Sequence, residues 1–257
     1  MEKILKRPKP RGRHRLWEHD AALCKVVPSL VGIDEAGRGA FAGPVVAGAV
    51  WVNQHFFEGA ELKRATKPIF DSKALDPVER DALLTLLEEL QERGLLRYAP
   101  GLATVDEVEA HNVLGATRLA MQRALEALKL SLAPKTAIPL FDDTTSPHPH
   151  VLVDGRPLRT FPYAHEGLVQ GDAKSLVIAM ASIVAKVTRD RHMRDLAEKY
   201  PLYGFDAHKG YGTKSHQKAI IAHGVTPEHR ASFLIKMLNK HEPTASHAQN
   251  ELTFTRR

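Results

Sequence analysis

Four acidic residues stand where apolar segments of the chain begin or end, and their side chains are the first candidates for chemistry. Asp34 and Glu35 follow one apolar segment, Asp154 follows another, and Asp172 precedes a helix. Carboxylates next to a buried strand are costly unless solvent or an opposite charge neutralises them. Their oxygens are hard ligands that suit Mg²⁺ or Mn²⁺, and paired ions can drive phosphodiester cleavage. The four acids therefore predict a divalent metal site suited to phosphodiester hydrolysis.

A glycine-rich tripeptide follows the first two acids. Adjacent residues of a regular strand point to opposite faces, so Asp34 and Glu35 can share a site only if the strand loses regularity there. Gly37 and Gly39 favour such a distortion. They also let the backbone approach a ligand, while Arg38 between them offers a guanidinium fork to a phosphate. Gly-Arg-Gly alone is often only a turn, but its position favours a ligand-binding loop.

Simpler explanations exist for some acids taken singly. Asp154 is followed by glycine, which is an ordinary turn signal, and Asp172 would serve as a helix N-cap. Asp190 lies in a helix between two arginines, where we expect a structural ion pair. Asp142 and Asp143 lie in a segment rich in Pro and Thr, where we expect solvated turn residues. The complete set of four acids favours the metal site.

The segments that must position these residues alternate between strands and helices, which predicts an α/β fold with one main sheet. Strands are expected at 30–34, 44–52, 95–102 and 150–155, with a strand-like segment at 158–169. Helices are expected at 77–94, from 104 or 112 to 130, and at 171–199, 214–223 and 227–238. The second strand is almost continuously apolar, as a sheet covered on both faces requires.

The composition is typical of a globular protein, and the positive net charge favours binding to polyanions. Hydrophobic residues make up 43% and the net charge is +6, which favours nucleic acid without identifying it. No apolar run is long enough for a membrane span, and no apolar segment follows the basic N-terminus as in a secretory signal. Cys24 is the single cysteine and suits a reducing compartment. We therefore expect a cytoplasmic protein.

The charge distribution suggests how the chain is divided. Lysines and arginines crowd the first 15 residues against one glutamate, so we expect 1–28 to be a flexible basic extension that adds phosphate affinity. The main domain is expected at 29–200 and contains a loop or insertion at 131–149. A helical region at 201–240 would pack on it, and 241–257 would be a polar tail.

Seven ordered motifs strongly resemble the ribonuclease HII family. They are VGIDEAGRG at 31–39, AGPVVA at 42–47, DSK at 71–73, LVDG at 152–155, GDAK at 171–174, ASIVAKVTRDR at 181–191 and HKGYGT at 208–213. The motifs occur in the order of the family and span most of 32–229. This resemblance implies a ribonuclease H-like fold, with a central mixed β-sheet flanked by helices and a C-terminal helical extension.

The resemblance also implies the metal ligands and the reaction. Asp34, Glu35, Asp154 and Asp172 match the catalytic acids that bind Mn²⁺ or Mg²⁺, and Asp190 is the main rival of Asp172. The family hydrolyses the RNA strand of RNA/DNA hybrids. It also cuts on the 5′ side of ribonucleotides embedded in duplex DNA, leaving a 3′-hydroxyl and a 5′-phosphate by two-metal-ion catalysis.

The same resemblance implies the substrate contacts. Gly37, Arg38 and Gly39 match the loop that senses the ribose 2′-hydroxyl. Tyr211 matches an aromatic residue that stacks on the neighbouring sugar, and Lys73 matches a basic residue near the scissile phosphate. The expected partners are RNA/DNA hybrids and DNA containing ribonucleotides, with no membrane, and we expect a monomer.

Three alternatives remain open. A non-catalytic nucleic-acid binder would keep four costly carboxylates without use. A structure-selective DNA nuclease on the same fold would cut all-DNA junctions. A metal-free ribonuclease would need a histidine acid-base pair, but the histidines show no paired arrangement at strand ends, and we expect most of them at the surface. The histidines considered are His148, His150, His165, His208, His216 and His223.

Overall fold

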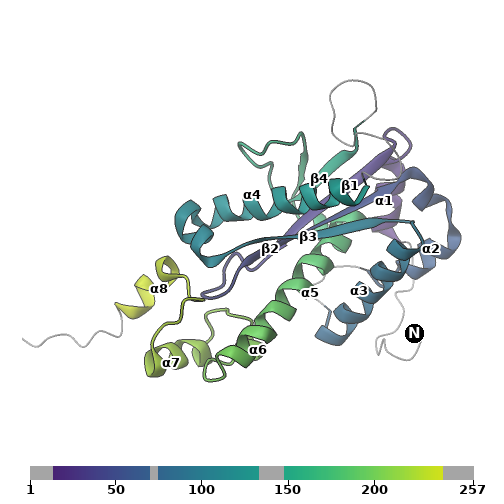
Figure 1. Ribbon diagram of the computed structural model, residues 1–257. Coiled ribbons are helices and arrows are strands. Elements are labelled where there is room, and N and C mark those ends of the chain that lie inside the picture. The colour runs from purple at the N-terminus through teal and green to yellow at the C-terminus, as the bar shows by residue number, and fades with distance from the viewer. Residues whose placement is uncertain (1–13, 70–74, 133–147, 240–257) are drawn as a thin grey trace, which may run out of the picture.

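The computed structural model describes residues 14–69, 75–132 and 148–239, and its centre is one mixed five-stranded sheet. Figure 1 shows this sheet between helices. The strands are β1 (Ser29–Ala36), β2 (Val45–Asn53), β3 (Arg97–Ala103), β4 (His150–Asp154) and β5 (Glu166–Leu168). Their order is β3-β2-β1-β4-β5. The pairs β1–β2 and β2–β3 are antiparallel, while β1–β4 and β4–β5 are parallel. The predicted α/β class with a central mixed sheet is confirmed.

Helices cover both faces of the sheet. In Figure 1, α4 (Val105–Leu132) lies on one face, and α5 (Leu176–Lys199) with α3 (Pro77–Glu92) lies on the other. Along β2, Val50 packs into the core beneath α5, whereas Ala49 packs into the core beneath α4. The strand is apolar almost throughout because each of its faces is covered by a helix.

Two glycines let α5 lie very close to the sheet. A Cβ atom on Gly32 of β1 would stand 2.2 Å from the carbonyl carbon of Val177, and one on Gly48 of β2 would stand 2.3 Å from the carbonyl oxygen of Ala181. Any side chain at these positions would push the helix away. The close approach therefore fixes α5 against the strand that carries Asp34.

The N-terminal segment differs from the expectation. Residues assigned by their charge to a flexible extension form α1 (Arg15–Leu23). Leu16 and Trp17 are buried in the same core as α5, and this apolar contribution outweighs the surrounding charges. Asp20 is also buried and accepts hydrogen bonds from Ser175 Oγ at 3.1 Å and Val177 N at 2.8 Å. Helix α1 thus satisfies polar groups at the start of α5.

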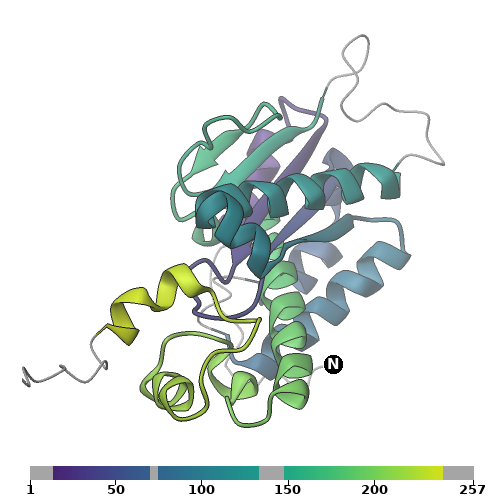
Figure 2. The same cartoon turned by 60° about the vertical axis from the view of Figure 1, so that its left-hand side comes forward.

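The remaining elements are short. They are η1 (Gln54–Glu58), α2 (Ala60–Ala65), η2 (Gly171–Ala173), α6 (Phe205–His208), α7 (Lys214–His223) and α8 (Ala231–Leu238). Figure 2 shows α6, α7 and α8 grouped near one end of α5. The strand-like segment at 158–169 contains only β5. No helix in the described part of the chain has the length and apolar character of a membrane span.

Candidate active site

The ends of two parallel strands bring Asp34 and Asp154 to the same edge of the sheet. Ile33 pairs with Val153 in the parallel β1–β4 ladder, so the acid that follows each residue lies at the same level. Both acids lie on the face that α5 covers, because successive side chains alternate. Asp34 is only 3% exposed, and Ser182 of α5 hydrogen-bonds its carboxylate. The sheet therefore positions two of the four predicted acids.

The third acid arrives from the turn before α5. Gly171 N donates a hydrogen bond of 2.7 Å to Asp154 Oδ1, which ties η2 to the end of β4. Asp172 is the next residue and is 6% exposed. The helix itself begins at Leu176 with Ser175 as its N-cap, so Asp172 lies in the preceding turn and does not cap α5. Asp34, Asp154 and Asp172 thus come from three separate segments at one edge.

Glu35, the fourth predicted acid, lies in a regular part of β1 and not in the predicted distortion. The β1–β2 register continues regularly through Glu35 and Ala36, so the expectation of an irregular strand is wrong. Glu35 consequently lies on the opposite face from Asp34. Its Oε1 accepts a hydrogen bond of 2.9 Å from Arg38 Nη1 in the following turn. The negative charge of Glu35 nevertheless raises the pKa of Asp34, so the two carboxylates are close enough to interact although the strand is regular.

Electrostatics at this edge disfavour negative charge. Burial raises the pKa of Asp34 well above its usual range, and the negative charges of Glu35 and Asp154 raise it further. Hydrogen bonds from Ser182 and from the Glu35 backbone act in the opposite direction. A cation at this edge would relieve the repulsion between these carboxylates.

The donor chemistry fits a hard divalent cation. All four candidates offer carboxylate oxygens, which suit Mg²⁺ and Mn²⁺ better than soft metals. Asp34 and Asp154 each use Oδ1 for a backbone N–H, but an ionised carboxylate has further lone pairs. As they stand, the described residues include no group of three or more His, Cys, Asp or Glu side chains that could hold a metal ion.

The predicted substrate residues meet beside this edge. Ala40, directly after the Gly37–Gly39 turn, pairs with Tyr211 in an isolated antiparallel bridge. Phe41 N donates a hydrogen bond of 2.8 Å to Gly210 O. The Tyr211 side chain is 38% exposed, so its ring is accessible. The structure therefore brings the glycine-rich turn and Tyr211 together from distant parts of the chain.

Two sequence assignments lie outside the described residues. Lys73 falls in the gap 70–74, and Asp142 and Asp143 fall in the gap 133–147. Their predicted roles stay predictions.

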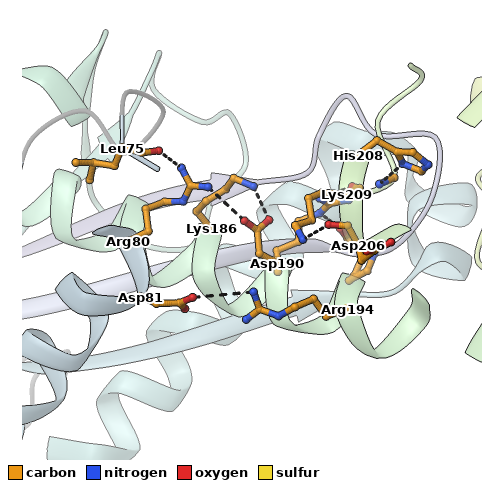
Figure 3. A network of polar contacts seen from close by, with 12 residues as sticks. Leu75, Arg80, Asp81, Lys186, Asp190, Arg194, Asp206, His208 and Lys209 are labelled. Carbon is orange, nitrogen blue, oxygen red and sulfur yellow. Dashed lines mark hydrogen bonds and ion pairs between the residues drawn. The ribbon is translucent and has the colours of Figure 1, made fainter. Parts of the chain in front are cut away.

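Asp190 belongs to an ion-pair network between α3 and α5 (Figure 3). Its carboxylate hydrogen-bonds Lys186 Nζ, and Oδ2 lies 3.6 Å from Arg80 Nη2. Arg80 also donates a hydrogen bond of 2.5 Å to the carbonyl of Leu75. The structural ion-pair interpretation of Asp190 is confirmed, with Lys186 and Arg80 as its partners.

One group of histidines lies in the interior and not at the surface where most were expected. His216 and His229 are buried, and their Nε2 atoms are 3.1 Å apart. The ring of His208 stacks on that of His216, with centroids 4.3 Å apart. Burial, together with the neighbouring histidines, lowers the pKa of His216 to about 4. No local pattern indicates this contact, because the three residues come from separate segments.

Two buried arginines beside the turn after β1 have no recognisable signal in the sequence. Arg189 and Arg230 are both 0% exposed and donate hydrogen bonds to backbone carbonyls of the segment after β1. The sequence suggests for Arg189 only an ion pair with the neighbouring Asp190, whereas its guanidinium bonds backbone carbonyls.

The match to a family model covers most of the chain. The model described as Ribonuclease HII matches residues 31–237. A ribonuclease HII of Ralstonia pickettii (strain 12J) is 40% identical over 228 residues, which cover 89% of this chain and 88% of that protein. The family resemblance is confirmed.

Solved structures share the fold. The ribonuclease H2 of Pyrococcus horikoshii OT3 aligns with a TM-score of 0.56 and 24% identity, over 82% of this chain and 98% of that one. A structure of Bst-RNase HIII in complex with Mn²⁺ aligns with a TM-score of 0.54 and 18% identity, over 86% of this chain and 69% of that one. The sheet and the ordered motifs agree with the matches to the family model and to the Ralstonia pickettii protein. The chain therefore belongs to the ribonuclease HII family, whose members are ribonuclease H-type hydrolases.

Proposed function

We propose that this ribonuclease H-type enzyme hydrolyses the RNA strand of RNA/DNA hybrids and cuts on the 5′ side of ribonucleotides embedded in duplex DNA. The products would carry a 3′-hydroxyl and a 5′-phosphate. The observation that supports the proposal is that the parallel pairing of β1 with β4 ends directly before Asp34 and Asp154, while Gly171, next to Asp172, hydrogen-bonds Asp154. The turn after β1 pairs with Tyr211 close by. Membership of the family supports the same activity.

Asp34, Glu35, Asp154 and Asp172 would hold Mn²⁺ or Mg²⁺. Held by these carboxylates, divalent cations would supply the chemistry of activating a water and stabilising the leaving 3′-oxygen. The chain itself orients the ligands, since Gly171 N fixes one oxygen of Asp154 and Ser182 holds Asp34. The Mn²⁺ complex of Bst-RNase HIII is a reason to test Mn²⁺ first.

The turn after β1 would recognise the ribose. A Cβ atom at Gly39 would meet nothing within 4 Å, so the backbone there is open to a ligand. The Arg38 side chain is 51% exposed and is available to a phosphate. The accessible ring of Tyr211 would stack on the adjoining sugar, and Lys73 would lie near the scissile phosphate. Action as a cytoplasmic monomer is part of the same proposal.

A cleavage assay with three labelled duplexes tests the proposal. One carries a single ribonucleotide, one a continuous RNA strand, and one is an all-DNA junction, each incubated with Mn²⁺, Mg²⁺ or EDTA. We expect cleavage of the first two with metal, a 3′-hydroxyl end that a polymerase extends, and no cleavage in EDTA. Equal cutting of the all-DNA junction would favour the DNA nuclease. Binding without cleavage would favour the non-catalytic binder, and cleavage in EDTA would favour histidine catalysis.

A further inference from the structure

Arg189 of α5 is a buried cation bound mainly by backbone. It is 0% exposed, and no ion pair among the described residues includes it. Desolvating a guanidinium is costly, and burial lowers the pKa of Arg189 accordingly. A hydrophobic side chain of similar size would avoid that cost, so the hydrogen bonds of Arg189 need an explanation beyond filling space.

The guanidinium of Arg189 joins two loops that are far apart in sequence. Nε donates to Pro44 O at 3.0 Å and Nη2 to Ala42 O at 3.1 Å, both in the segment after β1. Nη1 donates to Lys209 O at 2.9 Å, in the turn before Tyr211. The planar fork of arginine is suited to such bonds in several fixed directions, whereas a lysine ammonium is not.

The same side chain also touches both candidate substrate elements. The guanidinium carbon of Arg189 lies 5.4 Å from the centroid of the Tyr211 ring, within the range of a cation–π contact. A Cβ atom on Gly37 would stand 2.0 Å from Arg189 Nε, so the glycine backbone lies directly on the guanidinium group. Arg189 is therefore packed between the turn and the aromatic ring.

Arg230 holds the same segment from the other side. Its Nε and Nη2 donate to Gly43 O at 3.0 and 2.7 Å, and its Nη1 donates to Arg38 O at 3.1 Å. The backbone from Arg38 to Pro44 thus receives donors from two fully buried arginines.

We propose that Arg189 is a positioning residue that fixes the Gly37–Gly39 turn relative to Tyr211. Ribose recognition would then use a preset spacing between the backbone that senses the 2′-hydroxyl and the ring that stacks on the next sugar. The kinetic part of this inference rests on the proposed function. The structural part, a clamp between two loops, does not.

Amide hydrogen exchange tests the clamp without any activity. In Arg189→Met, which removes the donors and keeps an unbranched apolar chain, we expect roughly tenfold or faster exchange at Phe41 and Ala42, whose N–H groups bond Gly210 O. Exchange in the β1–β2 ladder should not change. Arg191→Met alters an exposed arginine of the same helix and should leave both regions unchanged. Unchanged exchange at Phe41 and Ala42 in Arg189→Met would overturn the proposal.

Kinetics distinguish positioning from general stabilisation. On the single-ribonucleotide duplex, Arg189→Met should lower kcat more than it raises KM. Its effect on kcat/KM should shrink when Tyr211→Ala is already present, because the two residues act together. Fully additive effects would show that Arg189 does not act through Tyr211 and would also overturn the proposal.

A second variant and the wild-type assay separate failure of this proposal from failure to fold and from failure of the proposed function. Arg189→Lys retains the charge and, if Arg189→Met does not fold, takes its place in both experiments with the same expected directions. Wild-type protein that cleaves none of the ribonucleotide substrates refutes the proposed function, whereas the exchange measurement still decides whether Arg189 clamps the loops.

Discussion

The two glycines of the turn after β1 have different surroundings, so the same substitution should affect them differently. Gly37 has φ of +92° and lies against Arg189, whereas Gly39 has open space around its missing Cβ. We expect Gly37→Ala to lower the free energy of unfolding by about 2 kcal/mol or more, because it adds backbone strain and a clash. Chemical denaturation measures this.

Gly39→Ala is the matched control for stability. We expect its free energy of unfolding to stay within about 0.5 kcal/mol of wild type. Its cleavage of a single-ribonucleotide duplex should nevertheless fall, since the added methyl group occupies the surface proposed to face the ribose. Equal destabilisation by both variants would contradict the described environment of Gly37.

Among the elements, α1 should contribute to stability through one buried carboxylate. Asp20→Ala leaves the Ser175 hydroxyl and the Val177 N–H without this acceptor, so we expect a loss of about 1–3 kcal/mol in the free energy of unfolding. The hydrogen bond to Asp20 also raises the pKa of His19, which should fall in the variant when followed by NMR.

Glu18→Ala on the same helix provides the comparison. Glu18 is partly exposed and lies 3.5 Å from Lys63 in a surface ion pair, whose loss should cost less than about 1 kcal/mol. If Asp20→Ala lowered the free energy of unfolding no more than Glu18→Ala does, or left the pKa of His19 unchanged, the described contacts between α1 and α5 would be contradicted.

Elements with strong local signals could be predicted from the sequence. Helix α3 begins at Pro77 behind the Asp76 cap, and Asp76 and Glu79 form a complete capping box. Helix α7 occupies the predicted residues, and β2 follows its apolar run. Helix α1 could not be predicted because the many charges around it obscured Leu16 and Trp17, the two apolar residues that pack into the core. The contacts of Asp20 also join residues far apart in sequence.

The candidate site was predictable to the extent that its residues occupy strand ends. Asp34 and Asp154 could be placed at one edge because parallel strands end together. The regular continuation of β1 through Glu35 was not foreseen, because the following glycines suggested a bulge. The contacts of Arg189 and the histidine cluster depend on tertiary packing that no sequence period indicates.

At the scale of the whole molecule, the buried histidines should make stability depend on pH. The pKa of His216 is about 4 in the folded state against an ordinary 6.5, so the unfolded chain binds its proton more readily. The contribution of neutral His216 is complete above about pH 6.5 and is lost as the pH falls toward 4. This window corresponds to a loss on the order of 3 kcal/mol.

The comparison of wild type with His216→Gln isolates this contribution from other titrating groups. We expect the free energy of unfolding of wild type to fall more steeply between pH 6.5 and 4 than that of the variant. His223→Gln changes an exposed histidine of the same helix and should keep the wild-type slope. Identical slopes for wild type and His216→Gln would contradict a neutral, buried His216.

The proposed reaction requires carboxylates from separate segments to act together at one edge of the sheet. Its most direct test is the cleavage rate of Asp154→Asn on a duplex with one ribonucleotide at saturating Mn²⁺, with Asp195→Asn, an exposed acid of α5, as control. We predict a loss of about 1000-fold or more for Asp154→Asn with a nearly unchanged melting temperature, and wild-type rates for the control. Near-normal turnover by Asp154→Asn would contradict the account.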